Sequence, residues 1–283
     1  MRRCATSNRL AADVLSIIIM SYNASKHLQD CLESLTTSPP STPHEIIVVD
    51  NASPDDSVAR VRSRWPNVTV IAQPANVGFA AANNVGIRAS NRELLLLLNN
   101  DTVVPAGAID SLVVRLFARP DVAVAGPRLV DGAGQPELSF GRMISPFNEL
   151  RQKMMLALYR RGVGPVSKWI ERETRREQLV DWVSGACLLV RRADAEAAGL
   201  LDERYFLYTE DVDFCAAIRA IGRHVLFTPA THVVHLGGRS RATIPDEVTR
   251  AYRRSQVAFY EKHHPRWAPV LRTYLRVKRQ FPQ

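Results

Sequence analysis

The sequence predicts an α/β fold with a mixed, mainly parallel sheet flanked by helices and followed by a helical C-terminal extension. Three observations lead to this expectation. In the first half of the chain, short apolar strands alternate with amphipathic helical patterns. The strands are apolar without interruption, as in sheets that are covered on both faces. The 283 residues are 46% hydrophobic and 23% charged, which is ordinary for a globular protein with a substantial core.

The elements of the first half follow one another in a regular order. We expect strands at 14–20, 45–50, 68–73, 93–98 and 122–130. We expect helices at 25–37, at 78–90, at 106–118 and from Ser53 onward. Ser25 is the expected N-cap of the first helix. Ser53 is followed by a proline and two acids, which is typical of the start of a helix.

The pattern is less regular after Gly132. Residues 148–180 are basic and helical in character, without a definite arrangement. We expect the remaining elements to be a strand at 180–192, a helix at 206–222, strands at 224–228 and 231–236, and a basic helical tail from Arg250.

Polar residues directly follow four of the predicted strands. They are Ser21, Tyr22 and Asn23; Asp50 and Asn51; Gln73 to Asn76; and Asn99, Asn100 and Asp101. In open parallel sheets, ligands bind beyond the carboxyl ends of the strands. Asn and Asp also favour turns for local reasons, which is the alternative explanation for any one of these residues. Four polar strand ends together predict a ligand site at this edge of the sheet.

Seven motifs follow one another along residues 14–240. They are SIIIMSYN (16–23), IIVVDNASPDDS (46–57), NVGFAAANNVGI (76–87), LLLLNNDT (95–102), WVSGACLLVRR (182–192), YFLYTEDVDFCAAIR (205–219) and VVHLGG (233–238). This set resembles the family 2 inverting glycosyltransferases, and within them the rhamnosyltransferase-like branch that extends bacterial cell-envelope glycans. The resemblance implies the GT-A fold, a Rossmann-like fold of nucleotide-diphospho-sugar transferases.

The same resemblance implies an organisation and a reaction. It divides the chain into a tail (1–13), a nucleotide-sugar-binding half (14–130), an acceptor-binding and catalytic half (131–240) and a basic helical extension (241–283). The implied donor is a nucleoside diphosphate sugar of dTDP or UDP, with L-rhamnose from dTDP-rhamnose as the first candidate. The implied acceptor is a cell-envelope glycan or a saccharide linked to a polyprenyl diphosphate.

The resemblance assigns ten residues to the donor site. They are Ser21, Tyr22, Asn23, Asp50, Asn51, Ser53, Asn76, Gly78, Asn83 and Asn100. The chemistry of Asp50 agrees with this role, because an ionised carboxylate only accepts hydrogen bonds and suits the imide N–H of uracil or thymine. Two alternatives stay open. Asp50 can be an ordinary turn acid, and the small residues of 76–87 can serve close packing of a helix on the sheet, which we prefer for the alanines.

Asp101 and His235 match the residues that bind a metal in the family. They imply a divalent cation, Mg²⁺ or Mn²⁺, on the diphosphate of the donor. Asn99 stands where the Asp-x-Asp signature of the family has its first acid. An amide supplies no charge, so we expect modest affinity for the metal. Alternatively, a histidine at the end of a strand can be purely structural.

Asp211 and Glu210 match the acidic pair that supplies the catalytic base. Inversion requires an acceptor hydroxyl to lose a proton as it attacks, so a carboxylate must lie on its side. We assign the base to Asp211, with Glu210 as the alternative; both acids would also offset a helix dipole. The resemblance places five further residues on the acceptor side: Trp182, Ser184, Gly185, Asp213 and Arg219.

The charge of the chain predicts an anionic partner, because the net charge is +9 and the pI is about 9.8. Residues 250–283 hold nine basic residues against Glu261 alone, a net +8, with aromatic residues between them. This tail predicts contact with an anionic membrane surface, with an ordinary solvated helix as the alternative. The sequence shows no apolar core of a signal peptide and no run long enough to span a bilayer. Scattered single cysteines favour a reducing compartment, so we expect a cytoplasmic protein that binds the inner face of the membrane peripherally.

Other classes of protein fit less well. The sequence has no zinc-ligand spacing and no RNA-recognition signature, so we expect no nucleic acid partner. The first strand is followed neither by G-x-G-x-x-G nor by a glycine- and arginine-rich loop, which argues against a dinucleotide oxidoreductase and a nucleotidyltransferase. The Gln-x-x-Arg-Trp motif of processive synthases is incomplete, since His263 stands three residues before Arg266. A non-catalytic nucleotide-sugar-binding protein stays open because of Asn99.

Overall fold

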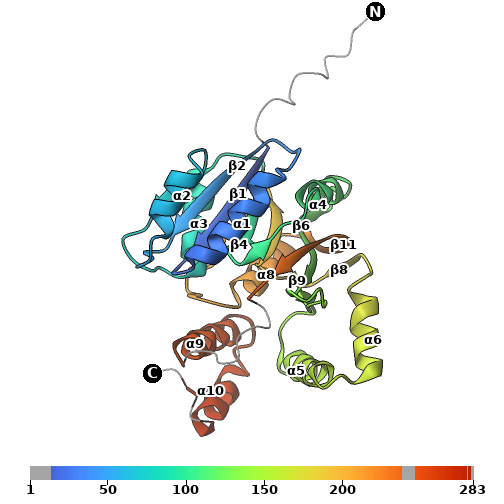
Figure 1. Cartoon of the computed structure of the whole chain (residues 1–283). Helices are drawn as coiled ribbons and strands as arrows, with labels where there is room; N and C mark the ends of the chain where they lie inside the picture. Colours follow the sequence, from blue (N-terminus) through green and yellow to red (C-terminus); the bar gives the residue numbers. More distant parts are fainter. Residues whose placement is uncertain (1–13, 238–245, 279, 282–283) are drawn as a thin grey trace, which may run out of the picture.

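The computed structural model describes residues 14–237, 246–278 and 280–281. The tail at 1–13 that the sequence predicts therefore lies outside the described residues, as do Gly238 at the end of the last motif and Arg279 of the basic tail. Strands and helices alternate through the first half of the chain and build one central sheet with helices on both sides (Figure 1). The predicted α/β fold is confirmed.

The strands form a large sheet and a small one. The large sheet has the order β3-β2-β1-β4-β10-β6-β11-β5, with β8 also paired to β11, and the small sheet joins β7 to β9. The strand bounds are β1 (Leu15–Ser21), β2 (His44–Asp50), β3 (Thr69–Ala72), β4 (Leu94–Asn99), β5 (Thr102–Val103), β6 (Val122–Val130), β7 (Phe140–Gly141), β8 (Gln178–Val180), β9 (Trp182–Val183), β10 (Cys187–Arg191) and β11 (His224–His235). The pairs β1–β2, β1–β4, β2–β3 and β6–β11 are parallel, and β10 runs antiparallel between β4 and β6.

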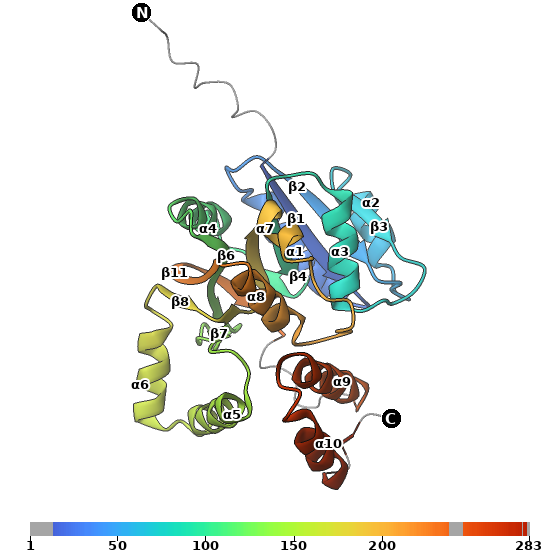
Figure 2. The same cartoon turned by 180° about the vertical axis from the view of Figure 1, so that it is seen from behind.

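The helices cover the two faces of the large sheet. Their bounds are α1 (Ser25–Thr37), α2 (Ser57–Arg64), α3 (Phe79–Ala89), α4 (Ala108–Phe117), α5 (Pro146–Arg160), α6 (Gly164–Glu173), α7 (Arg192–Ala197), α8 (Glu210–Ala220), α9 (Asp246–His263) and α10 (Ala268–Val277). Side chains of α1, α2 and α4 belong to the core on one face, and those of α3, α7, α8, α9 and α10 to the core on the other (Figures 1 and 2).

The leucines of β4 show why the strand is apolar without interruption. Leu94, Leu96 and Leu98 pack into the core on the side of α1, and Leu95 and Leu97 into the core on the side of α3. Successive side chains of a strand point to opposite faces, so a strand at the centre of a two-sided sheet needs an apolar residue at every position. The run ends at Asn99 because there the strand leaves the core.

Three predicted element boundaries are wrong. Helix α2 begins at Ser57 and not at Ser53, because Asp55 Oδ1 accepts hydrogen bonds from the amide and hydroxyl of Ser57 and holds the preceding residues in a turn. The single strand predicted at 180–192 is divided among β8, β9 and β10, with a turn at 184–186. The helix predicted from 206 begins at Glu210, because Tyr208 and Thr209 both have a φ of +68° and interrupt a right-handed helix.

Two smaller expectations also need correction. Ser25 is the first residue of α1 and not its N-cap, which is Ala24; the Ser25 hydroxyl donates to Asp56 instead. The two strands predicted at 224–228 and 231–236 are one strand, β11, with an irregularity between Thr228 and His232.

The basic tail is packed against the body of the protein. Phe259 of α9 and Leu275 of α10 are fully buried, and Tyr260 is 3% exposed. Residues 148–180, which the sequence leaves without a definite arrangement, form most of α5 together with α6 and β8. Among the described helices, none combines the length and the apolar character needed to cross a bilayer.

Candidate active site

The strand register brings the predicted ligand residues to one edge of the sheet. Strand β1 lies between β2 and β4, with Ser21 opposite Asp50 and Met20 opposite Asn99. All three strands run parallel, so their carboxyl ends meet. The edge therefore gathers polar groups from three separate segments of the chain, as the alternation of strands and helices requires.

Asp50 has one carboxylate oxygen without a partner. Its Oδ2 accepts a hydrogen bond from the amide of Ser53 at 3.0 Å. Its Oδ1 is buried and has no hydrogen-bond partner among the described residues. A buried acceptor without a partner costs free energy, so this oxygen is suited to a donor group of a ligand. Nearby, Asn100 Nδ2 donates to Ser21 Oγ at 3.1 Å, and the amide of Asn23 donates to Ser53 Oγ at 2.9 Å. Tyr22 between them is exposed.

Asn51 fixes the loop before α3. Its Nδ2 donates to Asn76 Oδ1 at 2.8 Å and to the carbonyl of Gly78 at 3.2 Å, and its Oδ1 accepts from the amide of Val77 at 3.0 Å. Gly78 has a φ of +87°, and a Cβ there would lie 2.6 Å from the carbonyl oxygen of Phe206. The described hydrogen bonds of the predicted donor residues Asn51, Asn76 and Gly78 thus stabilise the conformation of this loop.

Asn83 lies deeper than the other predicted donor residues. It is 1% exposed, and its Nδ2 donates to the carbonyl of Phe79 one turn earlier in α3. Its Oδ1 is buried without a partner among the described residues. No described contact joins Asn83 to Asp50 or Asp101, so the structure leaves it inside α3 rather than at the strand ends.

Asp101 and His235 meet across the edge of the sheet. Strand β5 pairs with the end of β11, and the amide of Leu236 donates to the carbonyl of Asp101 at 2.8 Å. His235 Nε2 lies 3.4 Å from Asp101 Oδ1. On the other side of the ring, His235 Nδ1 lies 3.0 Å from Glu137 Oε2. Glu137 thus orients the imidazole so that its Nε2 faces Asp101.

The charges of this triad depend on one another. Burial lowers the pKa of His235, but the hydrogen bonds and charges of Asp101 and Glu137 outweigh it and raise this pKa to about 9. Burial raises the pKa of Asp101, but the hydrogen bond and charge of His235 bring it below its ordinary value. Without a cation, an imidazolium at His235 offsets one of the two negative charges of Asp101 and Glu137.

The donor atoms here fit a hard divalent cation. Asn99 Oδ1 is buried and lacks a hydrogen-bond partner among the described residues, and Asp101 Oδ1 is buried with His235 Nε2 as its ion-pair partner at 3.4 Å. A Cβ at Gly237 would lie 2.0 Å from Asp101 Oδ2, so the glycine leaves room that a side chain would fill. In the part of the chain that the structure describes, no three His, Cys, Asp or Glu side chains are grouped to hold a metal by themselves. The other ligands would have to come from a bound diphosphate and water.

Asp211 is held in a fixed position by backbone amides. It lies in the first turn of α8, where its Oδ2 accepts from the amide of Gly185 at 2.8 Å and its Oδ1 from the amide of Val212 at 2.8 Å. A Cβ at Gly185 would lie 3.2 Å from the Cβ of Asp211. The turn between β9 and β10, with Ser184 and Gly185, therefore packs directly against the proposed base.

The neighbouring acid Glu210 differs from Asp211 in its environment. Burial, and then the charge of Asp211, raise the pKa of Glu210 well above its ordinary value. Burial also raises the pKa of Asp211, but the amides of Gly185 and Val212 offset part of this effect. Glu210 Oε2 has no hydrogen-bond partner among the described residues. Glu210 is therefore the harder of the two acids to ionise, and Asp211 is the better candidate for an ionised acceptor of a proton.

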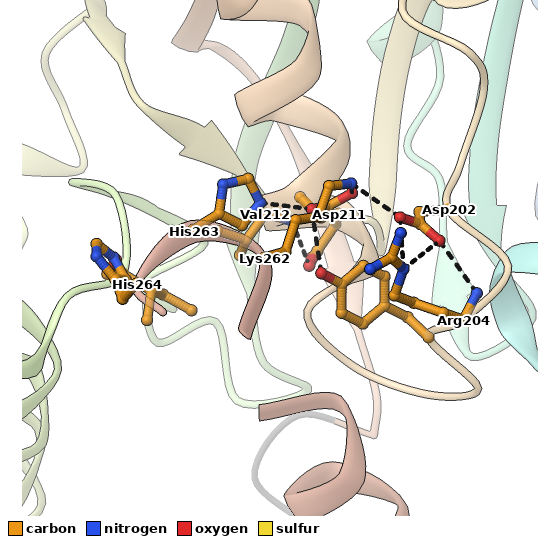
Figure 3. Close-up of polar contacts among 10 residues, drawn as sticks. Asp202, Arg204, Asp211, Val212, Lys262, His263 and His264 are labelled. Carbon is orange, nitrogen blue, oxygen red and sulfur yellow. Dashed lines mark hydrogen bonds and ion pairs between the residues drawn. The ribbon is translucent and has the colours of Figure 1, made fainter. Parts of the chain in front are cut away.

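Asp213 does not lie with Asp211. It is 2% exposed and accepts hydrogen bonds from the Tyr205 hydroxyl at 3.1 Å, Lys262 Nζ at 2.8 Å and His263 Nε2 at 2.6 Å. Figure 3 shows Lys262 and His263 of α9 reaching toward α8 at this point. Asp213 thus joins α8 to the C-terminal extension, a connection that the sequence does not predict.

The other acceptor-side residues lie around the turn that holds Asp211. Trp182 of β9 is 8% exposed, and its Nε1 donates to the carbonyl of Arg142 at 2.9 Å. Arg219, near the end of α8, forms an ion pair of 2.9 Å with Asp181, the residue before Trp182. The ion pair joins α8 to the residue before β9, and no described contact brings Trp182 or Arg219 to the carboxylate of Asp211.

Sequence reasoning missed Glu137 and Thr209. Glu137 lies 98 positions before His235 in an irregular segment, so no spacing or periodicity connects the two residues. Thr209 precedes the acidic pair with a φ of +68°, and its hydroxyl oxygen is buried without a partner in the described parts of the chain. The positive φ of Thr209 distinguishes it in the structure, but a backbone conformation cannot be seen in the sequence, which therefore carries no signal for this residue.

Comparison with known proteins identifies the family of the chain. The family model described as "Glycosyl transferase family 2" matches residues 16–177, more than half of the chain. An N-acetylglucosaminyl-diphospho-decaprenol L-rhamnosyltransferase of Mycobacterium tuberculosis is 29% identical over 266 residues, which cover 90% of this chain and 86% of the relative. The low-salt glycan biosynthesis hexosyltransferase Agl10 of Haloferax volcanii is 27% identical over 211 residues, 73% of this chain and 62% of the relative.

Solved structures resemble the fold at low sequence identity. A mannosyltransferase from Pyrobaculum calidifontis in complex with GDP-Man and Mn²⁺ matches with a TM-score of 0.57 at 18% identity, over 91% of this chain and 67% of that one. GalNAc-T7 with UDP, GalNAc and Mn²⁺ matches with a TM-score of 0.60 at 16% identity, over 86% of this chain and 48% of that one. The fold is therefore GT-A. The chain belongs to glycosyl transferase family 2 and is a glycosyltransferase.

Proposed function

We propose that this glycosyltransferase moves L-rhamnose from dTDP-rhamnose to a saccharide that is linked to a polyprenyl diphosphate, with inversion at the anomeric carbon. The substrate class rests on the mycobacterial relative, whose name specifies an L-rhamnosyltransferase acting on a diphospho-decaprenol saccharide and which this chain matches over most of its length. Such an acceptor lies at a membrane, so the reaction takes place at a membrane surface, which we assign to the cytoplasmic face.

The residues at the strand ends contact different parts of the donor. Asp50 Oδ1 accepts the imide N–H of thymine or uracil, which fits its unpartnered and buried state. Asp101 and His235 hold a divalent cation, with Glu137 orienting the imidazole. When bound, Mg²⁺ or Mn²⁺ stabilises the negative charge of the leaving diphosphate.

Asp211 takes the proton of the acceptor hydroxyl. The raised pKa of this residue makes it a stronger base than an exposed aspartate, while the amides of Gly185 and Val212 fix its direction. As the hydroxyl oxygen bonds to the anomeric carbon, the bond to the diphosphate breaks on the opposite side and the proton passes to Asp211. Burial and the charge of Asp211 raise the pKa of Glu210 well above its ordinary value, so Glu210 ionises less readily and is the weaker candidate for this role.

One observation carries the proposal: Asp50 Oδ1 is buried without a partner among the described residues, at the edge of the sheet where Asp101 and His235 meet. Calorimetric titration with dTDP, UDP and GDP, each with Mn²⁺ and with EDTA, tests it. We expect one pyrimidine diphosphate to bind, and to bind more weakly with EDTA. Preferred binding of UDP would replace dTDP-rhamnose by a UDP-sugar.

A non-catalytic role is the second candidate function, because Asn99 replaces an acid in the metal-binding motif. Incubation with dTDP-rhamnose and a lipid-linked acceptor, with released dTDP and glycosylated product measured together, separates the two. Binding of nucleotide without either product would favour the non-catalytic binder. No nucleotide binding by folded protein would exclude both candidates.

A further inference from the structure

We propose that α5 and α10 together form a docking surface for an anionic lipid bilayer. The surface consists of two apolar stripes from distant parts of the chain. The α5 stripe is Phe147, Leu150 and Met154, and the α10 stripe is Trp267, Val270, Tyr274 and Val277. We call the two stripes together the α5–α10 face.

The α5 stripe is apolar but turned away from the protein. Its residues are spaced by three and four positions, which places them on one side of the helix. Phe147 is 75% exposed, Leu150 68% and Met154 56%. Single exposed apolar residues are common on protein surfaces, but a row of three along one helix side needs a partner to cover it.

Helix α10 has two apolar sides. Leu275 and Ala268 are buried, and Leu271 packs against the same core. The α10 stripe lies on another side, at spacings of three and four positions, and Val277 at its end is 77% exposed. A helix that only closed the core would need one apolar side, so the second side indicates a second contact.

The two stripes are continuous. The rings of Phe147 and Trp267 pack edge to face with centroids 6.0 Å apart. In Figures 1 and 2, α5 and α10 both lie at the lower end of the molecule, away from the N-terminal strands of the sheet. Side chains more than 100 positions apart in sequence therefore form one apolar face.

Basic residues lie next to both stripes and indicate that the partner of the α5–α10 face is anionic. Arg151 and Lys153 are exposed on α5, and Arg266 and Lys278 are exposed beside the two ends of α10. Lys153 pairs with Glu149, which is mostly buried. Aromatic and aliphatic residues bordered by arginine and lysine match the acyl and headgroup layers of an anionic bilayer. A second copy of this chain would bring the same positive charges together, which makes it the weaker candidate.

Docking at this face would bring the proposed base close to the bilayer. Residues of α5 and α9 line a cavity of about 200 Å³, and Thr209, two positions before Asp211, lines it as well. This step rests on the proposed function, because only a lipid-linked acceptor would gain from the approach. The docking surface itself depends on the exposed stripes alone.

Co-sedimentation with vesicles of phosphatidylcholine, with and without phosphatidylglycerol, tests the surface. We expect the full chain to bind only the vesicles with phosphatidylglycerol. The double variant Leu150→Ser with Val277→Ser should bind about tenfold more weakly, since it removes two apolar side chains from the contact. Val114→Ser with Leu179→Ser, at two other exposed apolar positions, is the matched control and should bind as the parent does.

The charged residues have a separate test. Arg151→Gln with Lys278→Gln should weaken binding by about fivefold for each charge removed, and only on vesicles that contain phosphatidylglycerol. Equal binding of the parent to both vesicle types, or parent-like binding of the Ser variant, would overturn the proposal. So would a parent dimer in light scattering that the Ser variant dissociates, because the face would then be an interface between copies.

A transfer assay with a short, water-soluble acceptor separates this proposal from the proposed function. The Ser variant should transfer sugar to that acceptor at the parent rate. If neither protein transfers, the proposed function fails while the vesicle result still stands. If only the Ser variant fails, the α5–α10 face contributes to catalysis and the docking proposal is wrong.

Discussion

Asp211 and Glu210 are neighbours in the chain, but their surroundings favour ionisation to different degrees. Two backbone amides stabilise the ionised form of Asp211, whereas Glu210 has an oxygen with no partner among the described residues. We therefore expect Asp211→Asn to lower the transfer rate by roughly 10²–10⁴-fold. Nucleotide binding measured by calorimetry should stay unchanged, because the strand ends are untouched. Transfer by Asp211→Asn at the parent rate would remove the assignment of the base.

Glu210→Gln should behave differently, and its stability should depend on pH in a defined way. The folded-state pKa of Glu210 is raised, so above the ordinary glutamate pKa the unfolded chain releases a proton that the folded chain keeps. The parent therefore loses stability as pH rises from the unfolded toward the folded pKa, by up to about 1.4 kcal/mol per pH unit. Glu210→Gln lacks this loss.

Urea denaturation across pH measures this difference. The free energy of unfolding of Glu210→Gln should gain on that of the parent as pH rises above about 4.3. The variant should also retain transfer, since glutamine resembles the protonated acid. A constant difference from pH 4 to pH 8 would mean that Glu210 ionises normally in the folded protein.

Glu137 is expected to act through His235. Its carboxylate accepts from Nδ1 of the imidazole and leaves Nε2 for the metal. Glu137→Gln keeps an acceptor but loses the charge, so Mn²⁺-dependent nucleotide binding should weaken by about tenfold. Binding with EDTA should not change. Glu33→Gln, at an exposed position of α1, is the control; equal effects of the two variants would rule out a specific role for Glu137.

At the scale of elements, local patterns predicted most of the fold. The five leucines of β4 predict a strand that is covered on both faces. In the structure, alternate leucines pack into the cores on opposite sides of the sheet. The sequence could not reveal where a helix starts when a nearby side chain forms hydrogen bonds with the backbone amides of its first turn. Asp55 holds residues 53–56 in a turn, and the start of α2 moves to Ser57. Local propensity cannot distinguish such a turn from a first helical turn.

In the helix pair α8–α9, one residue of a recognised motif has structural contacts that the motif does not predict. Asp213 is part of the motif that the sequence assigns to the acceptor side, yet it is buried against α9. Asp213→Ala removes the acceptor of the buried Tyr205 hydroxyl and of His263, and leaves Lys262 with Asp202 alone. We expect the free energy of unfolding to fall by about 2–3 kcal/mol, measured in urea.

A neighbouring aspartate provides the control for this prediction. Asp202 shares Lys262 with Asp213 but is more exposed, so Asp202→Ala should cost less than about 1 kcal/mol. If Asp213→Ala is as stable as the parent and has lost transfer, Asp213 belongs to the acceptor site after all.

At the scale of the whole molecule, long-range contacts set the limit of sequence reasoning. Strand ends and their polar residues could be located because parallel strands share one edge. Glu137, which lies 98 positions from His235, could not be located because no periodic pattern links them. The contact of Phe147 with Trp267 could not be located from the sequence either, because no pattern links these distant positions. This contact joins the exposed apolar stripes of α5 and α10 into one surface.

The C-terminal extension illustrates this limit, because its charge predicts contact with a membrane surface but not how the extension packs. The structure buries Phe259, Tyr260 and Leu275 against the body. Burial of each such side chain contributes roughly 1.5–3 kcal/mol, a large share of the 5–15 kcal/mol that stabilises a typical domain. A chain that ends at residue 245 should therefore unfold at a much lower urea concentration than the full chain, or fail to fold. A chain that ends at Phe281 is the control and should match the parent. If the chain ending at residue 245 keeps the parent midpoint, the extension is a detachable arm, and vesicle binding should then be tested on the arm itself.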